Sequence, residues 1–160
     1  MSARRTGLRP YAVAFAIATA VAATGAGLTN LGPWYRELVK PSWQPPDWLF
    51  GPAWTLIFAL CAVAGAGAWA RAGDAAARRR LLTAFAVNGV LNVSWSALFF
   101  RLQRPAWALV EVVLLWASIV VLMRVCAASW RPAAWLLAPY VAWVSFASVL
   151  NAAIVRLNPA

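Results

Sequence analysis

Five long apolar stretches fill almost the whole chain and constrain its fold more than any other feature. Four of them, at residues 10–31, 48–70, 81–100 and 132–155, contain no charged residue, and the fifth, at 105–123, contains only Glu111. A helix needs about 20 residues to cross roughly 30 Å of hydrocarbon, and a helix satisfies its own backbone hydrogen bonds there. We therefore predict an all-α, integral membrane domain over residues 1–160, with five transmembrane helices at about 10–31, 48–70, 81–100, 105–125 and 132–156.

Composition and charge support a membrane protein and argue against a nucleic-acid partner. Of the 160 residues 64% are hydrophobic and 11% are charged, which is more apolar surface than a water-soluble globule can bury. The net charge of +10 comes from basic residues spread over loops and termini, as the positive-inside rule predicts. Nine of the fourteen lie on the side of the amino terminus, which we expect inside. The first stretch is too long for a signal peptide, the alternative reading.

Two polar and aromatic stripes are predicted to face the interior of the bundle. They recur at helical spacing on the third and fifth spans: Asn88, Asn92, Trp95 and Phe99, and Tyr140, Trp143 (or Val144), Ala147 and Asn151. Amides are costly against lipid. Together with Trp54 at a similar depth, the stripes predict a pocket of indole rings and amides for a large planar lipophilic ligand. Asn88 alone is better explained as a residue that joins helices by a hydrogen bond.

The segment KPSWQPPDWLFGPAW at residues 40–54 combines four prolines with three tryptophans. Prolines stiffen the chain, and the rings of Trp43 and Trp48 offer apolar area to bury. Trp48, with Trp69 at the other end of the same span, also fits a belt of tryptophans at the membrane interface. With an odd number of spans, this segment, the turn after Phe100 and the carboxyl terminus lie on one side. We therefore expect a lid over the pocket, formed by Trp43, Pro45, Pro46 and Trp48.

The residues that are missing narrow the chemistry. The chain has no histidine, and Cys61 and Cys126 both lie in apolar stretches. This excludes a Cys-His or Ser-His-Asp enzyme and a histidine-bound haem or zinc, so we expect no metal site and no required cofactor. Glu111 is the only carboxylate within a span and is a functional candidate for that reason. Pairing with Arg104 explains it equally well.

Four motifs resemble the TspO/translocator protein family, TspO/MBR, also called the peripheral-type benzodiazepine receptor family. They are KPSWQPPDWLFGPAW at 40–54, LNVSWSALFF at 91–100, WALVE at 107–111 and PYVAWVSFASVLN at 139–151. The resemblance implies a five-helix bundle, usually a homodimer, in a bacterial cell membrane. Its members bind porphyrins (tetrapyrroles), benzodiazepine-type ligands and, in animals, cholesterol. Ala152 stands where animal members have a tyrosine, so sterol binding is not implied here.

The resemblance also assigns ligand-binding residues by motif position. They are Ala23, Leu49, Trp54, Asn92, Trp95, Trp107, Trp143, Ala147 and Leu150. The function implied is a membrane receptor or translocator-like protein that binds porphyrins, with a sensing or transport-regulating role. Two alternatives stay open. One is light- and oxygen-dependent porphyrin degradation, in which Trp54 and Trp143 would take part; the other is transport of a porphyrin or sterol. Membrane lipid is a further expected partner.

Overall fold

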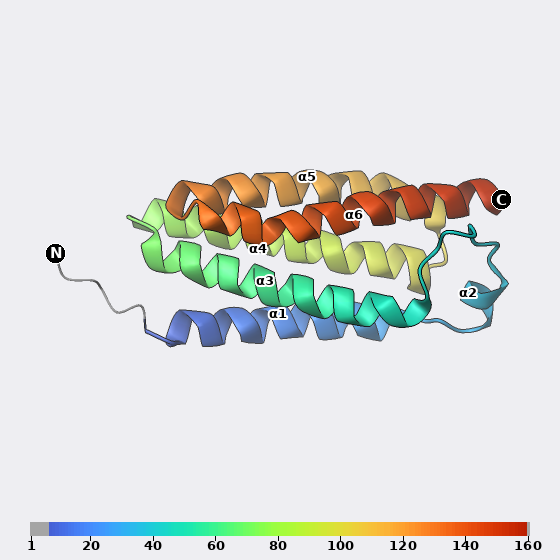
Figure 1. Cartoon of the computed structure of the whole chain (residues 1–160), viewed down its shortest axis with the longest axis horizontal. Coiled ribbons are helices and arrows are strands. Elements are labelled where there is room, and N and C mark those ends of the chain that lie inside the picture. Colours follow the sequence, from blue (N-terminus) through green and yellow to red (C-terminus); the bar gives the residue numbers. More distant parts are fainter. Residues whose placement is uncertain (1–6, 160) are drawn as a thin grey trace.

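The structure is a computed structural model that describes residues 7–159, and every regular element there is helical (Figure 1). Five of the helices are long and apolar enough to cross a membrane, which confirms the predicted fold class. They are α1 (Arg9–Leu28), α3 (Phe50–Arg71), α4 (Ala75–Ser96), α5 (Pro105–Ser129) and α6 (Pro132–Leu157). Three short elements complete the fold: α2 (Pro33–Glu37), the 3₁₀ turn η1 (Asp47–Leu49) and the π-helical turn η2 (Ala97–Arg101).

Helix boundaries follow the local sequence. Pro105 and Pro132 lie in the first turns of α5 and α6, where a missing N–H breaks no helical hydrogen bond. The carboxylate of Asp74 accepts the N–H of Ala77 and so starts α4 at Ala75, ahead of the predicted span at residue 81. At the other end of α4, η2 and the left-handed backbone of Gln103 (φ 54°) reverse the chain within a few residues.

The core lies among α3, α5 and α6, while α1 packs on the outside of the bundle (Figure 1). Aliphatic side chains fill it: Ile57, Val112, Leu115, Ile119, Leu122, Leu137 and Val144. The buried share of the most apolar window is 39% in α5 but only 6% in α1. Helix α1 is therefore the most weakly packed of the five long helices.

A hydrogen-bonded polar chain links three helices through the core. The side-chain amide of Asn88 donates to Ser118, and the Tyr140 hydroxyl donates to the Oδ1 of Asn88 (2.9 and 3.2 Å). Asn92 in turn donates to the Tyr140 hydroxyl (3.1 Å). Asn88 therefore joins α4 to α5 and α6, as one of its two predicted roles requires. The bond to Ser118 also sets the register between α4 and α5.

Candidate ligand-binding site

Three half-buried tryptophans from three helices define one end of the bundle, which we call the aromatic end: Trp54, Trp95 and Trp143. The ring of Trp54 on α3 lies 6.0 Å from that of Tyr140, and the ring of Trp143 on α6 lies 5.6 Å from that of Phe50. Trp95 on α4 stacks on Phe99 at 5.2 Å. Such offset and edge-to-face contacts hold flat apolar surfaces in fixed orientations.

Buried amides orient the rings of the aromatic end. The indole N–H of Trp95 donates to the Oδ1 of Asn151 (3.3 Å), and the Nδ2 of Asn151 donates to the carbonyl oxygen of Pro105 (2.9 Å). Asn151 and Asn92 are both buried, with 1% and 6% of their surface exposed. The prediction that the amide stripes face inward is thus confirmed, because each amide finds a partner on another helix.

Glu111 is the one member of this polar set without a partner. Only 8% of the residue is exposed, and neither carboxylate oxygen has a hydrogen-bond partner. The suggested pairing with Arg104 is therefore wrong, since Arg104 lies at the exposed start of α5. Because α4 and α5 run antiparallel and Asn88 bonds to Ser118, Glu111 lies about two turns from Ser118 along α5, at the level of Trp95 on α4. The aromatic end thus contains an unused hydrogen-bond acceptor.

The segment between α1 and α3 forms a cover over the aromatic end, and we define the cover as residues 34–47. Asn158, after the last helix, accepts the N–H of Val39 and donates to the Val39 carbonyl oxygen (both 2.9 Å). Tyr35 donates to Asp47 (3.0 Å), and Gln44 donates to both. Burial and the bond to Asp47 raise the pKa of Tyr35 to about 12. The cover is therefore fastened at two points.

The predicted lid residues take two different positions in the structure. The Trp43 ring packs 6.0 Å from that of Phe146 on α6, beside Trp143. Pro45 is half-buried and Pro46 exposed. Trp48 departs from the expectation of a buried ring, because 71% of it is exposed. It lies in η1 at the start of α3, where an indole suits the membrane interface.

The remaining predicted ligand-binding residues are not all gathered at the aromatic end. Leu150 is buried and packs with Phe99, while Leu49 and Ala147 are half-buried. Ala23 is exposed on α1. Trp107 is 67% exposed on the outside of α5, because the next inward positions belong to Ala108 and Glu111. The Trp107 ring therefore lies on the outside of the bundle, away from the aromatic end, and its assignment to a ligand site stays a prediction of the resemblance.

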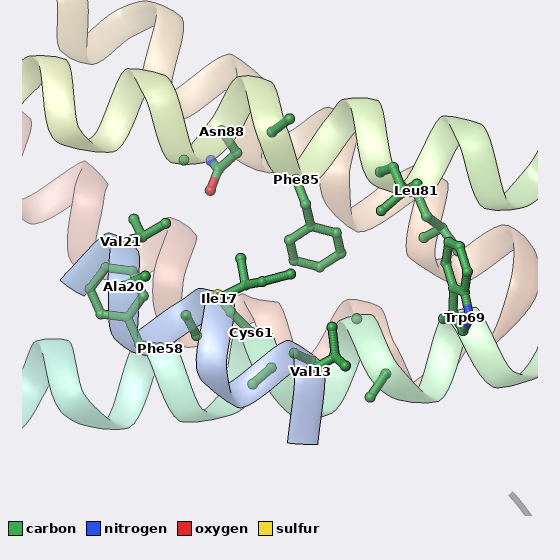
Figure 2. A pocket seen from close by; sticks show the side chains of 18 of the residues that line it. Val13, Ile17, Ala20, Val21, Phe58, Cys61, Trp69, Leu81, Phe85 and Asn88 are labelled. Atoms are coloured by element: carbon green, nitrogen blue, oxygen red, sulfur yellow. The ribbon is translucent and has the colours of Figure 1, made fainter. Parts of the chain in front are cut away.

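A cavity of about 960 Å³ lies elsewhere, between α1, α3 and α4, with Tyr140 at its floor; we call it the α1 cavity. Figure 2 shows Phe85 and Asn88 pointing from α4 toward Ile17 and Val21 of α1, with Cys61 of α3 behind them. None of the predicted ligand-binding residues lines this space. Apolar periodicity could not have revealed it, since the cavity depends on the distance between helices.

The five membrane-length helices and the apolar surface around them define an integral, multi-pass membrane protein. The chain belongs to the TspO/MBR family, whose model matches residues 12–157. It is 47% identical to the tryptophan-rich protein TspO of Chlorobaculum tepidum, over 79% of this chain and 80% of the relative. It is 32% identical to the tryptophan-rich sensory protein of Cereibacter sphaeroides (90% and 89%), and 31% identical to the translocator protein of Homo sapiens (78% and 75%).

Two residues of the site were missed by sequence reasoning, Asn158 and Tyr35. Asn158 carries the only amide after the last predicted span, which was a usable signal for a cap or a tether. Tyr35 lies in α2, a five-residue helix that begins with Pro33 directly after Gly32. A Gly-Pro pair at the end of an apolar stretch indicates a turn, but nothing in it shows that a helical turn follows.

Proposed function

We propose that this protein binds a porphyrin or a related planar lipophilic ligand at the aromatic end and has a sensing or transport-regulating role. The observation that carries the proposal is that three half-buried indoles from three helices lie at one end of the bundle, next to a cover held by hydrogen bonds. Flat apolar rings favour a flat apolar ligand. The names of the relatives, a tryptophan-rich sensory protein and a translocator protein, agree with such a role.

Each part of the aromatic end has a distinct task in this proposal. Trp54 and Trp143 supply faces against which a macrocycle packs, and Asn151 holds the Trp95 ring in place. Glu111 supplies an acceptor for an N–H group of the ligand, because its oxygens are unused and its surroundings exclude water. The cover separates the ligand from solvent, and entry requires the contacts of Val39 with Asn158 to open.

A fluorescence titration with protoporphyrin IX tests the proposal. Wild-type protein should show strong tryptophan quenching, and the double variant Trp54→Phe, Trp143→Phe should bind about tenfold more weakly, as expected when two aromatic anchors are trimmed. Trp135→Phe is the matched control, since this indole is 81% exposed on α6. Wild-type affinity in the double variant would contradict the proposal. Loss of affinity in Ala86→Phe, which fills the α1 cavity, would place the ligand there instead.

A second candidate function is light-dependent oxidation of a bound porphyrin. The observation that favours it is the contact between the Trp54 and Tyr140 rings, two oxidisable side chains 6.0 Å apart. Illumination of the complex should then yield a new absorbing product only when oxygen is present, and Trp54→Phe should slow its formation. If no product forms under light and oxygen, the oxidation function is excluded, and the proposal of porphyrin binding is unaffected.

We further propose a bacterial cell membrane as the location, with the amino terminus inside. Basic residues support this orientation. The end of the bundle that carries the starts of α1, α4 and α6 also carries the triplet Arg78, Arg79 and Arg80. A reporter enzyme that works only outside the cytoplasm should therefore be active when it is fused after residue 160. A cytoplasmic reporter signal would reverse the orientation without affecting ligand binding.

A further inference from the structure

We infer that the α1 cavity binds an anionic phospholipid, with an acyl chain between α1, α3 and α4 and the phosphate against Arg9 and Arg78. This inference does not rest on the proposed porphyrin site: the cavity adjoins the aromatic end through Tyr140, but Trp54, Trp95 and Trp143 do not line it. The contacts, the shape and the charge of the cavity each support it.

The walls of the cavity call for an apolar occupant. Most lining side chains are aliphatic or aromatic, for example Val13, Ile17, Leu82 and Phe85. Two of the polar side chains among them have partners: the Thr24 hydroxyl donates to the carbonyl oxygen of Ala20, and Asn88 bonds to Ser118 and Tyr140. A hydrocarbon chain therefore fits the apolar walls without breaking these hydrogen bonds.

The shape of the cavity suits a chain better than a disc. Its lining runs along α1 from Arg9 to Thr24, which is roughly 22 Å at about 1.5 Å per residue. It also follows α4 from Leu81 to Ser94 and α3 from Phe58 to Trp69. An elongated space parallel to the helices, opening toward the surrounding bilayer beside the weakly packed α1, matches a lipid tail lying along the membrane normal.

Positive charge is concentrated at one end of the cavity. Arg9 lines that end, and the Arg78 guanidinium lies 5.4 Å from the ring of Trp69, another lining residue. Asp74 is the only carboxylate in the nearby α3–α4 connection, and it is engaged with the N–H of Ala77. Arg79 and Arg80 line a second space of about 490 Å³ on the other side of α4. The first turns of α4 thus present basic residues between two apolar surfaces.

The basic end and the apolar walls of the α1 cavity together favour a phospholipid with an anionic headgroup. A phospholipid places its phosphate at the membrane surface and its chains directly beneath. Basic residues near the surface favour anionic headgroups over neutral ones. Phosphatidylglycerol is therefore expected to bind in preference to phosphatidylcholine, since the two differ in net headgroup charge but can carry the same chains.

Native mass spectrometry of the protein released from nanodiscs with equal phosphatidylglycerol and phosphatidylcholine tests the inference. Wild-type protein should retain phosphatidylglycerol selectively. The double variant Arg9→Gln, Arg78→Gln should lower this retention by on the order of tenfold, because two basic contacts are lost. Arg9→Lys, Arg78→Lys keeps the charges and should retain most of the lipid. The matched control Arg101→Gln, Arg104→Gln removes two charges at the opposite end and should change little.

A second pair of variants tests the acyl chain. Ala86→Phe places a ring in the cavity from an exposed position of α4, whereas Ala117→Phe adds the same ring on the outside of α5. Ala86→Phe should reduce lipid retention, and Ala117→Phe should not. If Arg9→Gln, Arg78→Gln and the control Arg101→Gln, Arg104→Gln lose the same amount of phosphatidylglycerol, the lipid is held only by general charge attraction, and the inference is overturned. A reduced dimer fraction in Ala86→Phe with unchanged lipid retention would also overturn it, because a second copy would then cover this face.

Protoporphyrin titration of the same variants separates this inference from the proposed function. If the arginine and Ala86 variants lose phosphatidylglycerol but bind protoporphyrin normally, the lipid site stands on its own. If they lose protoporphyrin and keep the lipid, the α1 cavity is the porphyrin site, and the lipid inference fails.

Discussion

The aromatic end and the α1 cavity are built from the same helices, α3 and α4, yet they are held in opposite ways. At the aromatic end, rings contact rings at 5.2–6.0 Å and the amides of Asn92 and Asn151 bond across helices. At the α1 cavity, small and aliphatic side chains face a helix with only 6% of its apolar window buried.

The contrast shows that directional contacts, rather than apolar burial alone, fix where a side chain packs in a membrane protein. Lipid tails are as apolar as leucine, so an aliphatic wall gains little by leaving the lipid for another helix. Rings and amides gain specific partners instead. We therefore expect the aromatic end to keep one arrangement and the α1 cavity to adapt its width to its contents.

The largest effect is expected where the directional contacts converge, at Asn151. Asn151→Leu leaves the Trp95 indole N–H without its partner, which costs about 1–3 kcal/mol, and also removes the bond that ties α6 to the Pro105 carbonyl oxygen. The free energy of unfolding in mixed micelles should fall by about 3 kcal/mol. Ala86→Phe at the cavity should change it by less than about 1 kcal/mol. Equal losses in the two variants would remove the contrast between the regions.

The next largest effect is expected in the cover, which is held by hydrogen bonds to the end of the chain. Asn158→Ala removes both bonds to Val39, so residues 38–46 should exchange their amide hydrogens faster. A local loss of about 1–2 kcal/mol corresponds to roughly a tenfold change in exchange. Residues of α4 that line the cavity serve as the internal reference and should exchange as before. Unchanged exchange in the cover would show that Tyr35 and Gln44 hold it alone.

Glu111 sharpens the comparison, because it is the one polar group of the aromatic end that no contact supports. Glu111→Leu should leave the free energy of unfolding unchanged or raise it by about 1 kcal/mol, since a buried carboxylate without a partner does not stabilise the fold. Its protoporphyrin affinity should fall by about tenfold, and the affinity of Glu111→Gln should lie between those of wild type and Glu111→Leu. A strongly destabilised Glu111→Leu protein would show that the carboxylate has a structural role.

The smallest effect concerns pH and the Tyr35–Asp47 bond. Burial first, and then this bond, raise the pKa of Tyr35 to about 12, compared with about 10 in an unfolded chain. The unfolded chain therefore loses the proton first, and the contribution of Tyr35 is complete below pH 10 and lost as pH rises toward 12. The difference in melting temperature between wild type and Tyr35→Phe should shrink over that interval. A constant difference up to pH 12 would assign the contribution to packing.

Most of the fold was predictable from the sequence, because apolar length and helical spacing are strong constraints in lipid. The inward direction of Asn92 and Asn151 followed from the cost of an amide against hydrocarbon. The directions of Trp48 and Trp107 did not follow, since an indole near a helix end is stable both in a pocket and at the interface. A closer look at helical phase would have placed Trp107 on the outside, because Ala108, Glu111, Val112 and Leu115 share one buried face.

The α1 cavity and the tie between Val39 and Asn158 lay beyond such reasoning. The cavity results from how far α1 stands from α3 and α4, which no single helix encodes. The tie joins residues 119 positions apart, and although Asn158 could be recognised as a capping or tethering residue, nothing in the sequence identifies Val39 as its partner. Contacts of this kind depend on how the finished helices are placed in space.

That long-range tie also has a consequence for the order of assembly during synthesis. Val39 leaves the ribosome early, but its partner is among the last residues of the chain. These hydrogen bonds therefore cannot form while the first four long helices are being inserted, and the cover closes only once α6 is in place. A ligand present during translation would therefore reach the aromatic end before the cover closes.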